Sequence, residues 1–155
     1  MKVLVFSDSH GTITYMQQAI RSEEPDVVLH LGDVMRDARA LQREYPQLRL
    51  EQVCGNCDGP DAQPEELELT LQGHKIMMTH GHPYHVKLGS AWVVRTAQER
   101  GAEVLLFGHT HIPLVDRVGS LWVMNPGTIQ GLGQTTYGVM TLEQDKIDCR
   151  IVSLR

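Results

Sequence analysis

The sequence predicts an α/β fold with a parallel β core, followed by strands that pair mainly antiparallel. Three observations support this prediction. Short runs rich in Val, Leu and Ile recur along the whole chain at lengths typical of strands. Amphipathic helical patterns lie between several of the early runs, and this alternation is typical of βαβ units. Toward the C-terminus the runs follow one another across short turns, as they do in hairpins.

Strands and helices alternate in the first half of the chain. The first helical pattern ends before Pro25, because a proline disfavours helical geometry at the residue before it. A second, more polar helix is predicted over Asp37–Tyr45, and Pro46 ends it. The apolar face of the first helix is formed by Ile13, Met16, Ala19 and Ile20. The strands around these helices are predicted at Val3–Phe6, Val27–Leu31 and Leu48–Val53.

The second half is predicted to hold mainly antiparallel strands around one further helix. After a loop over Gly59–Glu66, a turn at Gly73 joins the strands Leu67–Leu71 and Ile76–Met78. Ser90 is placed to cap a helix that Gly101 ends, and the buried strand Val104–Phe107 follows. Two hairpins then turn at Gly119-Ser120 and Asp145-Lys146. Their strands are Leu114–Val118, Leu121–Met124, Tyr137–Leu142 and Ile147–Leu154.

The composition is that of a globular protein, and it argues against several functional classes. The 155 residues suffice for one domain, which we place over residues 1–155, and 41% of them are hydrophobic. A net charge of -5, from 14 Lys and Arg against 19 Asp and Glu, argues against a protein that coats nucleic acid or anionic membrane. No apolar run has the length of a signal peptide or membrane span, so a cytoplasmic location is predicted. Three cysteines do not make a secreted disulfide framework.

Polar residues that can bind metal follow five of the predicted strands, at the point where each strand ends. Because ligands bind at the carboxyl edge of open α/β sheets, these residues are expected to converge on one edge. A single motif of this kind arises readily by chance, whereas five in order at strand ends do not. The five segments are Ser7-Asp8-Ser9-His10, Gly32-Asp33, Cys54-Gly55-Asn56-Cys57-Asp58, Thr79-His80-Gly81-His82 and Gly108-His109-Thr110-His111.

The types of these residues predict a site for two divalent metal ions. Carboxylate, imidazole and amide ligands suit first-row divalent ions, and we expect Mn²⁺ ahead of Fe²⁺, Ni²⁺ or Zn²⁺. The set is larger than one tetrahedral site takes, and it suits two adjacent ions that share a carboxylate. The candidate ligands are Asp8, His10, Asp33, Asn56, His80, His109 and His111.

The ordered motifs resemble the calcineurin-like metallophosphoesterase superfamily. They are most similar to its small prokaryotic phosphodiesterases, which are related to the retromer subunit of vacuolar protein sorting. The resemblance covers nearly the whole chain, and it implies an αββα sandwich of two mixed β-sheets packed face to face between outer helices. The motifs that carry it are Asp8-x-His10, Gly32-Asp33, Gly55-Asn56-x-Asp58, His80-Gly81-His82, Gly108-His109-x-His111 and, with Thr for the subfamily's Ser, Asn125-Pro126-Gly127-Thr128.

The resemblance also implies a ligand set and a reaction. It assigns one ion to Asp8, His10, Asp33 and His111, and the other to Asp33, Asn56, His80 and His109. Asp33 then bridges the two ions. The implied reaction is hydrolysis of a small phosphodiester substrate by hydroxide held between the ions. Asn56 and His82 are the candidates for holding the phosphate oxygens.

Cys57 departs from the broad superfamily, in which many members have a histidine at this position. That histidine assists the phosphate or the leaving group. A thiol with the usual pKa of about 8.5 is a weak proton donor to an alkoxide. We therefore expect substrates with good leaving groups to be cleaved much faster than unactivated alkyl esters.

The same residues are compatible with other sites and functions. Cys54 and Cys57 form a Cys-x-x-Cys pair, but the turn Asp58-Gly59-Pro60 follows in place of the helix that a thioredoxin-like thiolate needs. A structural zinc site from the two cysteines, His80 and His82 leaves the other motifs unexplained. A phosphomonoesterase, a nuclease and a retromer-like protein-binding scaffold stay open as alternatives. The complete ligand set favours an enzyme over a scaffold.

The remaining histidines and basic residues carry weaker expectations. His30 is expected in the core with its hydrogen bonds satisfied, His74 in solvent at a turn, and His85 at the rim of the site. A basic row on the second helix favours a solvated face over a rim that receives phosphate, and it comprises Arg36, Arg39 and Arg43. No membrane partner is predicted, nucleic acid is disfavoured, and a homo-oligomer stays open.

Overall fold

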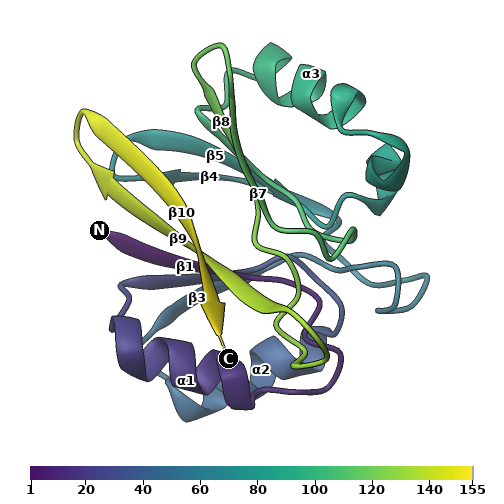
Figure 1. Cartoon of the computed structure of the whole chain (residues 1–155), viewed down its shortest axis with the longest axis vertical. Coiled ribbons are helices and arrows are strands. Elements are labelled where there is room, and N and C mark those ends of the chain that lie inside the picture. Colours follow the sequence, from purple (N-terminus) through teal and green to yellow (C-terminus); the bar gives the residue numbers. More distant parts are fainter. Residues whose placement is uncertain (155) are drawn as a thin grey trace.

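Two mixed five-stranded β-sheets pack face to face in the computed structural model, which describes residues 1–154. The first sheet has the strand order β10-β9-β1-β2-β3, and the second has the order β4-β5-β6-β8-β7. In Figure 1, α1 and α2 lie beneath the first sheet and α3 lies beyond the second, so the layers run helix, sheet, sheet, helix. This arrangement confirms the predicted αββα sandwich.

The elements of the two layers interleave along the chain. The first sheet contains β1 (Lys2–Phe6), β2 (Val27–His30), β3 (Arg49–Gln52), β9 (Thr135–Glu143) and β10 (Lys146–Leu154). The second contains β4 (Glu66–Leu71), β5 (His74–Thr79), β6 (Val104–Leu106), β7 (Leu114–Val118) and β8 (Leu121–Asn125). The helices are α1 (Thr14–Glu23), α2 (Met35–Glu44) and α3 (Ala91–Glu99), and two short 3₁₀ turns cover His82–Tyr84 and Val86–Leu88.

The central strands β1, β2 and β6 are almost wholly apolar because both of their faces are buried. In β1, Val3 and Val5 point into the core between the sheets, whereas Leu4 and Phe6 point toward α1 and α2. In the second sheet, Leu105 packs on Val93 of α3. Successive side chains of a strand therefore point into two separate apolar layers, which explains why these apolar runs are continuous in the sequence.

The structure corrects several element boundaries and one pairing. β5 begins at His74 rather than Ile76, and the last hairpin turns one residue earlier than predicted, because Lys146 already pairs with Glu143. Ser90 precedes α3 but makes no side-chain capping bond. The second half is less antiparallel than predicted, because β6 pairs in parallel with both β5 and β8.

Parallel pairing brings the carboxyl ends of sequence-distant strands together. β1, β2 and β3 run parallel, and so do β5 and β6. Backbone hydrogen bonds continue beyond the strands: the Asp8 N–H donates to the Gly32 carbonyl (2.9 Å), and the Gly108 N–H donates to the His80 carbonyl (2.9 Å). The loops that carry the predicted ligands are thereby fixed beside one another. Within residues 1–154, no helix is long and apolar enough to cross a membrane.

Candidate metal centre

The predicted ligands stand on loops that leave the strand ends in a left-handed backbone conformation. Asp8, His10, Asp33, His109 and His111 all have positive φ angles, between 47° and 69°. Residues other than glycine adopt this region only a few per cent of the time, and such residues cluster at functional sites. The loops therefore bend sharply at the residues that turn their side chains toward the centre.

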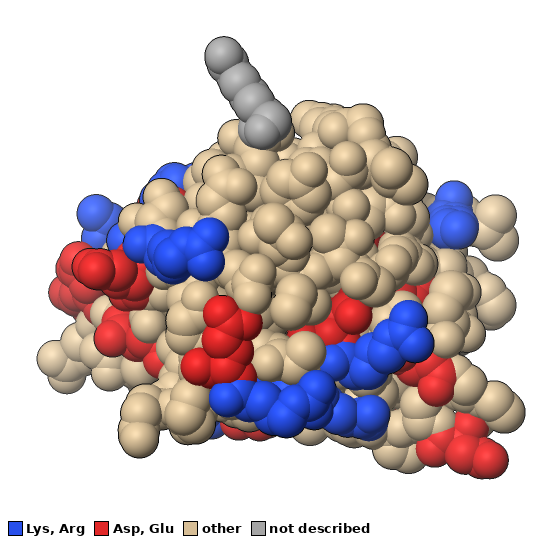
Figure 2. Space-filling model, turned by 90° about the horizontal axis from the view of Figure 1, so that it is seen from below, with Lys and Arg blue, Asp and Glu red and all other residues tan. Residues whose placement is uncertain are grey.

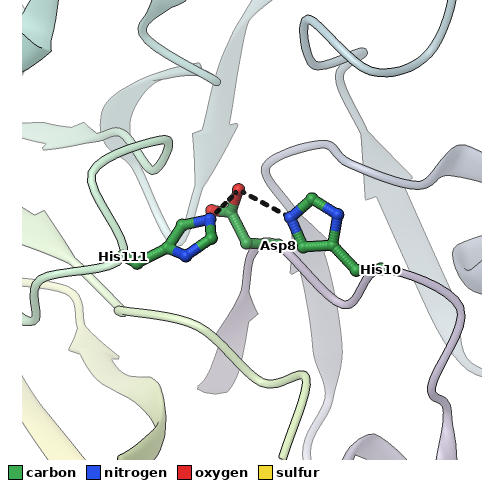
Figure 3. Close-up of side chains that lie close together, drawn as sticks. All are labelled: Asp8, His10 and His111. Carbon is green, nitrogen blue, oxygen red and sulfur yellow. Dashed lines mark hydrogen bonds and ion pairs between the residues drawn. The ribbon is translucent and has the colours of Figure 1, made fainter. Parts of the chain in front are cut away.

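Asp8 is fully buried, and its two carboxylate oxygens have different surroundings. Oδ2 accepts hydrogen bonds from the Ser7 hydroxyl (2.5 Å) and from the His109 backbone N–H (3.1 Å). Oδ1 faces His111 Nε2 at 3.1 Å and His10 Nε2 at 3.6 Å. Figure 3 shows both imidazole rings directed at this carboxylate from opposite sides. One oxygen thus fixes the side chain, and the other points between two imidazole nitrogens.

Asp33 lies between this group and the buried His80. Its Oδ1 accepts a hydrogen bond from the Cys57 backbone N–H (2.9 Å). Its Oδ2 lies 3.5 Å from His80 Nε2 and 3.9 Å from His10 Nε2. Burial opposes ionisation of this carboxyl, but the His80 ring and the Cys57 N–H outweigh burial and hold the pKa of Asp33 below its usual range. The carboxylate is therefore charged at neutral pH and central in the cluster.

His80 shows that the cluster has the donor set of a cation site. Its Nδ1 lies 2.8 Å from the Leu31 carbonyl, to which the ring must donate. In the neutral ring, Nε2 then carries a lone pair. This nitrogen lies 3.0 Å from Asn56 Oδ1, 3.2 Å from His109 Nδ1 and 3.5 Å from Asp33 Oδ2. Carboxylate, amide and imidazole atoms that converge in this way are the donor set that first-row divalent ions prefer, so the residues present fit divalent metal ions.

His109 and His82 are held as neutral rings. Burial above all, together with the nearby His80 and Lys87, lowers the pKa of His109 to about 4. Burial and His80 also lower the pKa of His82. The ring of His82 lies beside His80, with centroids 5.5 Å apart, and its Nδ1 is buried without a hydrogen-bond partner. Neutral imidazoles are the forms that bind metal or hydrogen-bond a phosphate.

Cys57 is exposed at the edge of the same cluster. Ligand atoms of His10, Asp33 and Cys57 lie within 4.8 Å of one another. Burial and a hydrogen bond to the Asp33 carboxylate raise the pKa of this thiol. Cys54 is buried instead, and its thiol donates to the Ala62 carbonyl (3.2 Å). Among residues 1–154, no potential metal cluster includes Cys54, which leaves the structural zinc interpretation without support.

Two glycines permit the close approach of the ligand loops. A Cβ at Gly55 would lie 2.0 Å from Asp33 Oδ1. A Cβ at Gly108 would lie 2.1 Å from the Ser7 hydroxyl oxygen. Any side chain at either position would displace a carboxylate or its hydrogen-bond donor. The glycines of the Gly-Asn and Gly-His motifs are therefore required by packing within the site itself.

Residues beyond the predicted ligand set hold the loops in place. The Asp58 carboxylate accepts hydrogen bonds from the backbone N–H groups of Gly55 (2.7 Å), Asp33 (3.1 Å) and Met35 (2.8 Å). The Asn125 amide donates to the Gly108 carbonyl (3.1 Å) and to the Thr110 hydroxyl (3.0 Å). Both residues belong to motifs visible in the sequence, although the motifs alone gave no role for them.

A second pair of supports lies around Asp8 and the first loop. The Thr128 hydroxyl donates to the Asp8 carbonyl (2.8 Å). The buried Asp37 of α2 accepts from the Ser9 hydroxyl (2.6 Å) and the Gly11 N–H (2.7 Å). Asp37 has no signal in the sequence, because an acidic residue in the first turn of a helix is ordinary.

Of the three other histidines, His30 was predicted correctly, His74 was not, and the expectation for His85 stays a prediction. His30 is buried, as predicted: it accepts a hydrogen bond from the Gly32 N–H (3.1 Å) and lies 3.0 Å from the Ser9 hydroxyl. The prediction for His74 was wrong, because this side chain is buried between Glu103 and the Glu143 carbonyl. His85 is exposed and stacks on Trp92, with ring centroids 5.9 Å apart.

The basic row on α2 is exposed, as predicted. Its members, Arg36, Arg39 and Arg43, are all solvent-accessible. Figure 2 views the molecule from the side of α1 and α2, and basic and acidic side chains are interspersed over this face. Charges of both signs in such an arrangement are typical of a solvated helix surface.

Comparison with known proteins agrees with the geometry. Residues 1–146 match the family model described as the calcineurin-like phosphoesterase superfamily domain. The chain belongs to this superfamily. It is 35% identical over 156 residues to the probable metallophosphoesterase YsnB of Bacillus subtilis, with 97% of this chain and 89% of that protein covered.

One further relative and one solved structure extend the comparison. The phosphodiesterase YfcE of Escherichia coli is 24% identical over 168 residues, which cover 90% of this chain and 87% of that protein. The crystal structure of Vps29 from Chaetomium thermophilum superimposes with a TM-score of 0.82 at 16% identity, covering 100% of this chain and 92% of that chain. The likeness to Vps29 shows a shared fold. Membership of the superfamily supports a metal-dependent hydrolase.

Proposed function

We propose that the chain is a phosphodiesterase whose centre holds two divalent ions. The observation that carries this proposal is the convergence of ligand atoms around Asp8 and Asp33. Ligand atoms lie within 4.8 Å of one another in three groups: Asp8, His10 and His111; Asp8, Asp33 and His80; and His10, Asp33 and Cys57. Two carboxylates and several imidazoles arranged in overlapping groups suit two adjacent ions better than one.

Each ion has a proposed set of ligands. Asp8, His10, Asp33 and His111 would hold the first, and Asp33, Asn56, His80 and His109 the second. Mn²⁺ is the proposed ion, and Fe²⁺, Ni²⁺ and Zn²⁺ share its preference for these ligands. When bound, the ions would activate water as the nucleophile and neutralise charge on the phosphoryl oxygens. Asp33 fits the bridging role because its Oδ2 faces both His10 and His80.

The chain's own side chains bind and orient the substrate in this proposal. His82 is the candidate for holding a phosphate oxygen, because it lines the same hollow as Asn56 and a lowered pKa keeps its ring neutral. Asn56 is exposed at the same edge and contributes its amide. Cys57 stays protonated at neutral pH, because its pKa is raised, and it is placed near the Asp33 carboxylate to meet a leaving group.

Hydrolysis of a diester is favoured over that of a monoester by one observation. The relative YfcE is named a phosphodiesterase, and the match covers 90% of this chain. The two ligand carboxylates offset only part of the charge of two divalent ions, so the site with its ions bound would attract an anionic phosphate ester. A small phosphodiester is therefore the proposed substrate class, hydrolysed by one domain formed by the chain.

Metal content and activity must be measured on the same purified sample to test this function. We expect two ions per chain and hydrolysis of bis(p-nitrophenyl) phosphate faster than of p-nitrophenyl phosphate. Chelation should abolish both activities, and Mn²⁺ should restore them. A folded, metal-free and inactive protein would contradict the enzymatic proposal and favour a protein-binding scaffold. Faster monoester hydrolysis would contradict the preference for diesters only.

A further inference from the structure

A mainly apolar groove of about 690 Å³ lies beside the proposed metal centre. We call it the Leu88–Ile112 groove. Three of its apolar side chains are strongly or partly exposed: Leu88 (90%), Ile112 (67%) and Leu114 (38%). The other residues that line it are Val86, Lys87, Gly89, Ser90, Phe107, Thr110, Pro113 and Asn125. Its size and composition, mainly apolar with a few polar groups, are those of a small-molecule site.

The groove adjoins the loop that carries two of the proposed ligands. Thr110 lines the groove and stands between His109 and His111, both proposed ligands. The Thr110 hydroxyl accepts a hydrogen bond from the Ile112 backbone N–H (3.1 Å) and another from the Asn125 amide (3.0 Å). A molecule bound to the ions would therefore have this wall of the groove directly beside it.

The groove is also preformed and carries a positive charge. Val86 and Phe107 are buried and give it a fixed floor. Lys87 lines the groove and is exposed, which leaves its ammonium group accessible to an anion. A second hollow, of about 340 Å³, has the proposed ligand Asn56 together with His82 and Glu65 in its lining.

We propose that the Leu88–Ile112 groove binds an apolar alkyl or aryl ester group of the substrate phosphodiester, while Lys87 contacts its phosphate. The inference rests on the proposed function and deepens it by naming the substrate class. A diester has two ester groups, and the two hollows receive one each. Burial of an apolar group against Leu88 and Ile112 removes apolar surface of both partners from water.

A substrate pair with one leaving group tests the proposal. Methyl p-nitrophenyl phosphate and phenyl p-nitrophenyl phosphate release the same p-nitrophenolate, so they differ only in the group assigned to the groove. We expect the wild-type enzyme to favour the phenyl ester about tenfold in kcat/KM, mainly through KM. Ile112→Ser and Leu88→Ser should each lose several times more activity on the phenyl ester than on the methyl ester. Lys87→Gln should weaken both substrates about equally.

The controls separate this proposal from competing explanations. Leu132→Ser changes a residue that is 75% exposed and outside the groove, and it should leave the preference unchanged. If the wild-type enzyme is metal-dependent but has equal kcat/KM for both esters, the proposed role of the groove is refuted and the proposed function is unaffected. No hydrolysis of either ester would overturn the proposed function itself. Ile112→Ser dissociating an oligomer, with equal loss on both esters, would assign the groove to a second copy of the chain.

Discussion

Two buried histidines, His74 and His80, have different surroundings, although one begins β5 and the other directly follows it. Both nitrogens of His74 face protein acceptors, the Glu103 carboxylate at 3.0 Å and the Glu143 carbonyl at 2.5 Å. His80 places Nδ1 against the Leu31 carbonyl, and its Nε2 lies 3.0 Å from Asn56 Oδ1 and 3.5 Å from Asp33 Oδ2. What separates the two rings is the number of ligand atoms nearby: those of Asp8, Asp33 and His80 lie within 4.8 Å of one another, whereas no such group among residues 1–154 contains His74. Burial by itself does not separate the two.

Asp33→Asn should have the largest effect, because it changes the carboxylate that faces His80 across the open side of the cluster. Loss of the bridging charge is expected to reduce kcat/KM at least about 100-fold and to release at least one of the two ions. Metal analysis with a diester assay measures both. His74→Gln is the matched control, since it alters a buried histidine outside the cluster and should keep both ions. Normal turnover with full metal content in Asp33→Asn would contradict the assignment.

Asn125→Ala should have the next largest effect, because Asn125 supports the loop that places His109 near His80. The substitution leaves the Gly108 carbonyl and the Gly127 N–H without their partner. We expect metal affinity to fall about 10- to 100-fold and stability to fall by about 1–3 kcal/mol. Thr136→Val removes only a bond to the Pro126 carbonyl, so it should lower stability without changing metal affinity. Equal metal affinity in Asn125→Ala and the wild type would refute this positioning role.

The pH dependence of stability should report the protonation of His74. Hydrogen bonds to Glu103 and the Glu143 carbonyl, together with the charge of Asp145, raise the pKa of His74 above 6.5. A raised pKa means that the protonated ring stabilises the folded state fully below pH 6.5, and that this contribution is lost as pH rises through the folded value. The pKa of Glu103 is lowered from 4.5, chiefly by His74, so its contribution is lost as pH falls through its own folded value.

Urea unfolding between about pH 6 and pH 9 measures this contribution. We expect wild-type stability to exceed that of His74→Gln by about 1–2 kcal/mol at the lower pH, and the difference to shrink as pH rises. The side chain at position 74 of His74→Gln does not titrate, so the curve of stability against pH for this variant serves as the reference. Parallel curves for the two proteins would show that His74 does not titrate as the geometry requires.

Cys57→Ala should have the smallest effect, because Cys57 lies at the exposed edge of the cluster whereas His74 and His80 are buried. Its raised pKa keeps the thiol protonated, but it is a weak acid toward an alkoxide. We expect a loss below about tenfold on a diester with an alkyl leaving group, and no loss on a p-nitrophenyl ester. The rates of both proteins on both substrates decide the matter. If Cys57→Ala and the wild type hydrolysed each of the two substrates at the same rate, a role for Cys57 in leaving-group departure would be excluded.

The sequence predicted the parts of this molecule that depend on local pattern. Strand ends followed by Asp, Asn and His are visible as motifs, and parallel pairing then brings them together. The position of His74 was not predictable, because its partner Glu143 is 69 residues away and lies in the other sheet. The groove beside Thr110 was equally hidden, since the side chains that line it come from segments far apart in the chain.

The proposed ligands are divided between the two sheets. Asp8, His10, Asp33 and Asn56 follow strands of the first sheet, whereas His80, His109 and His111 follow strands of the second. An ion held by both sets can bind only when the sheets are docked in their native register, so its binding energy adds to the free energy of unfolding. At a free metal concentration of 100 Kd the gain is about 2.7 kcal/mol. Thermal stability should therefore follow metal supply, and starvation for metal would expose the chain to proteolysis as well as inactivating it.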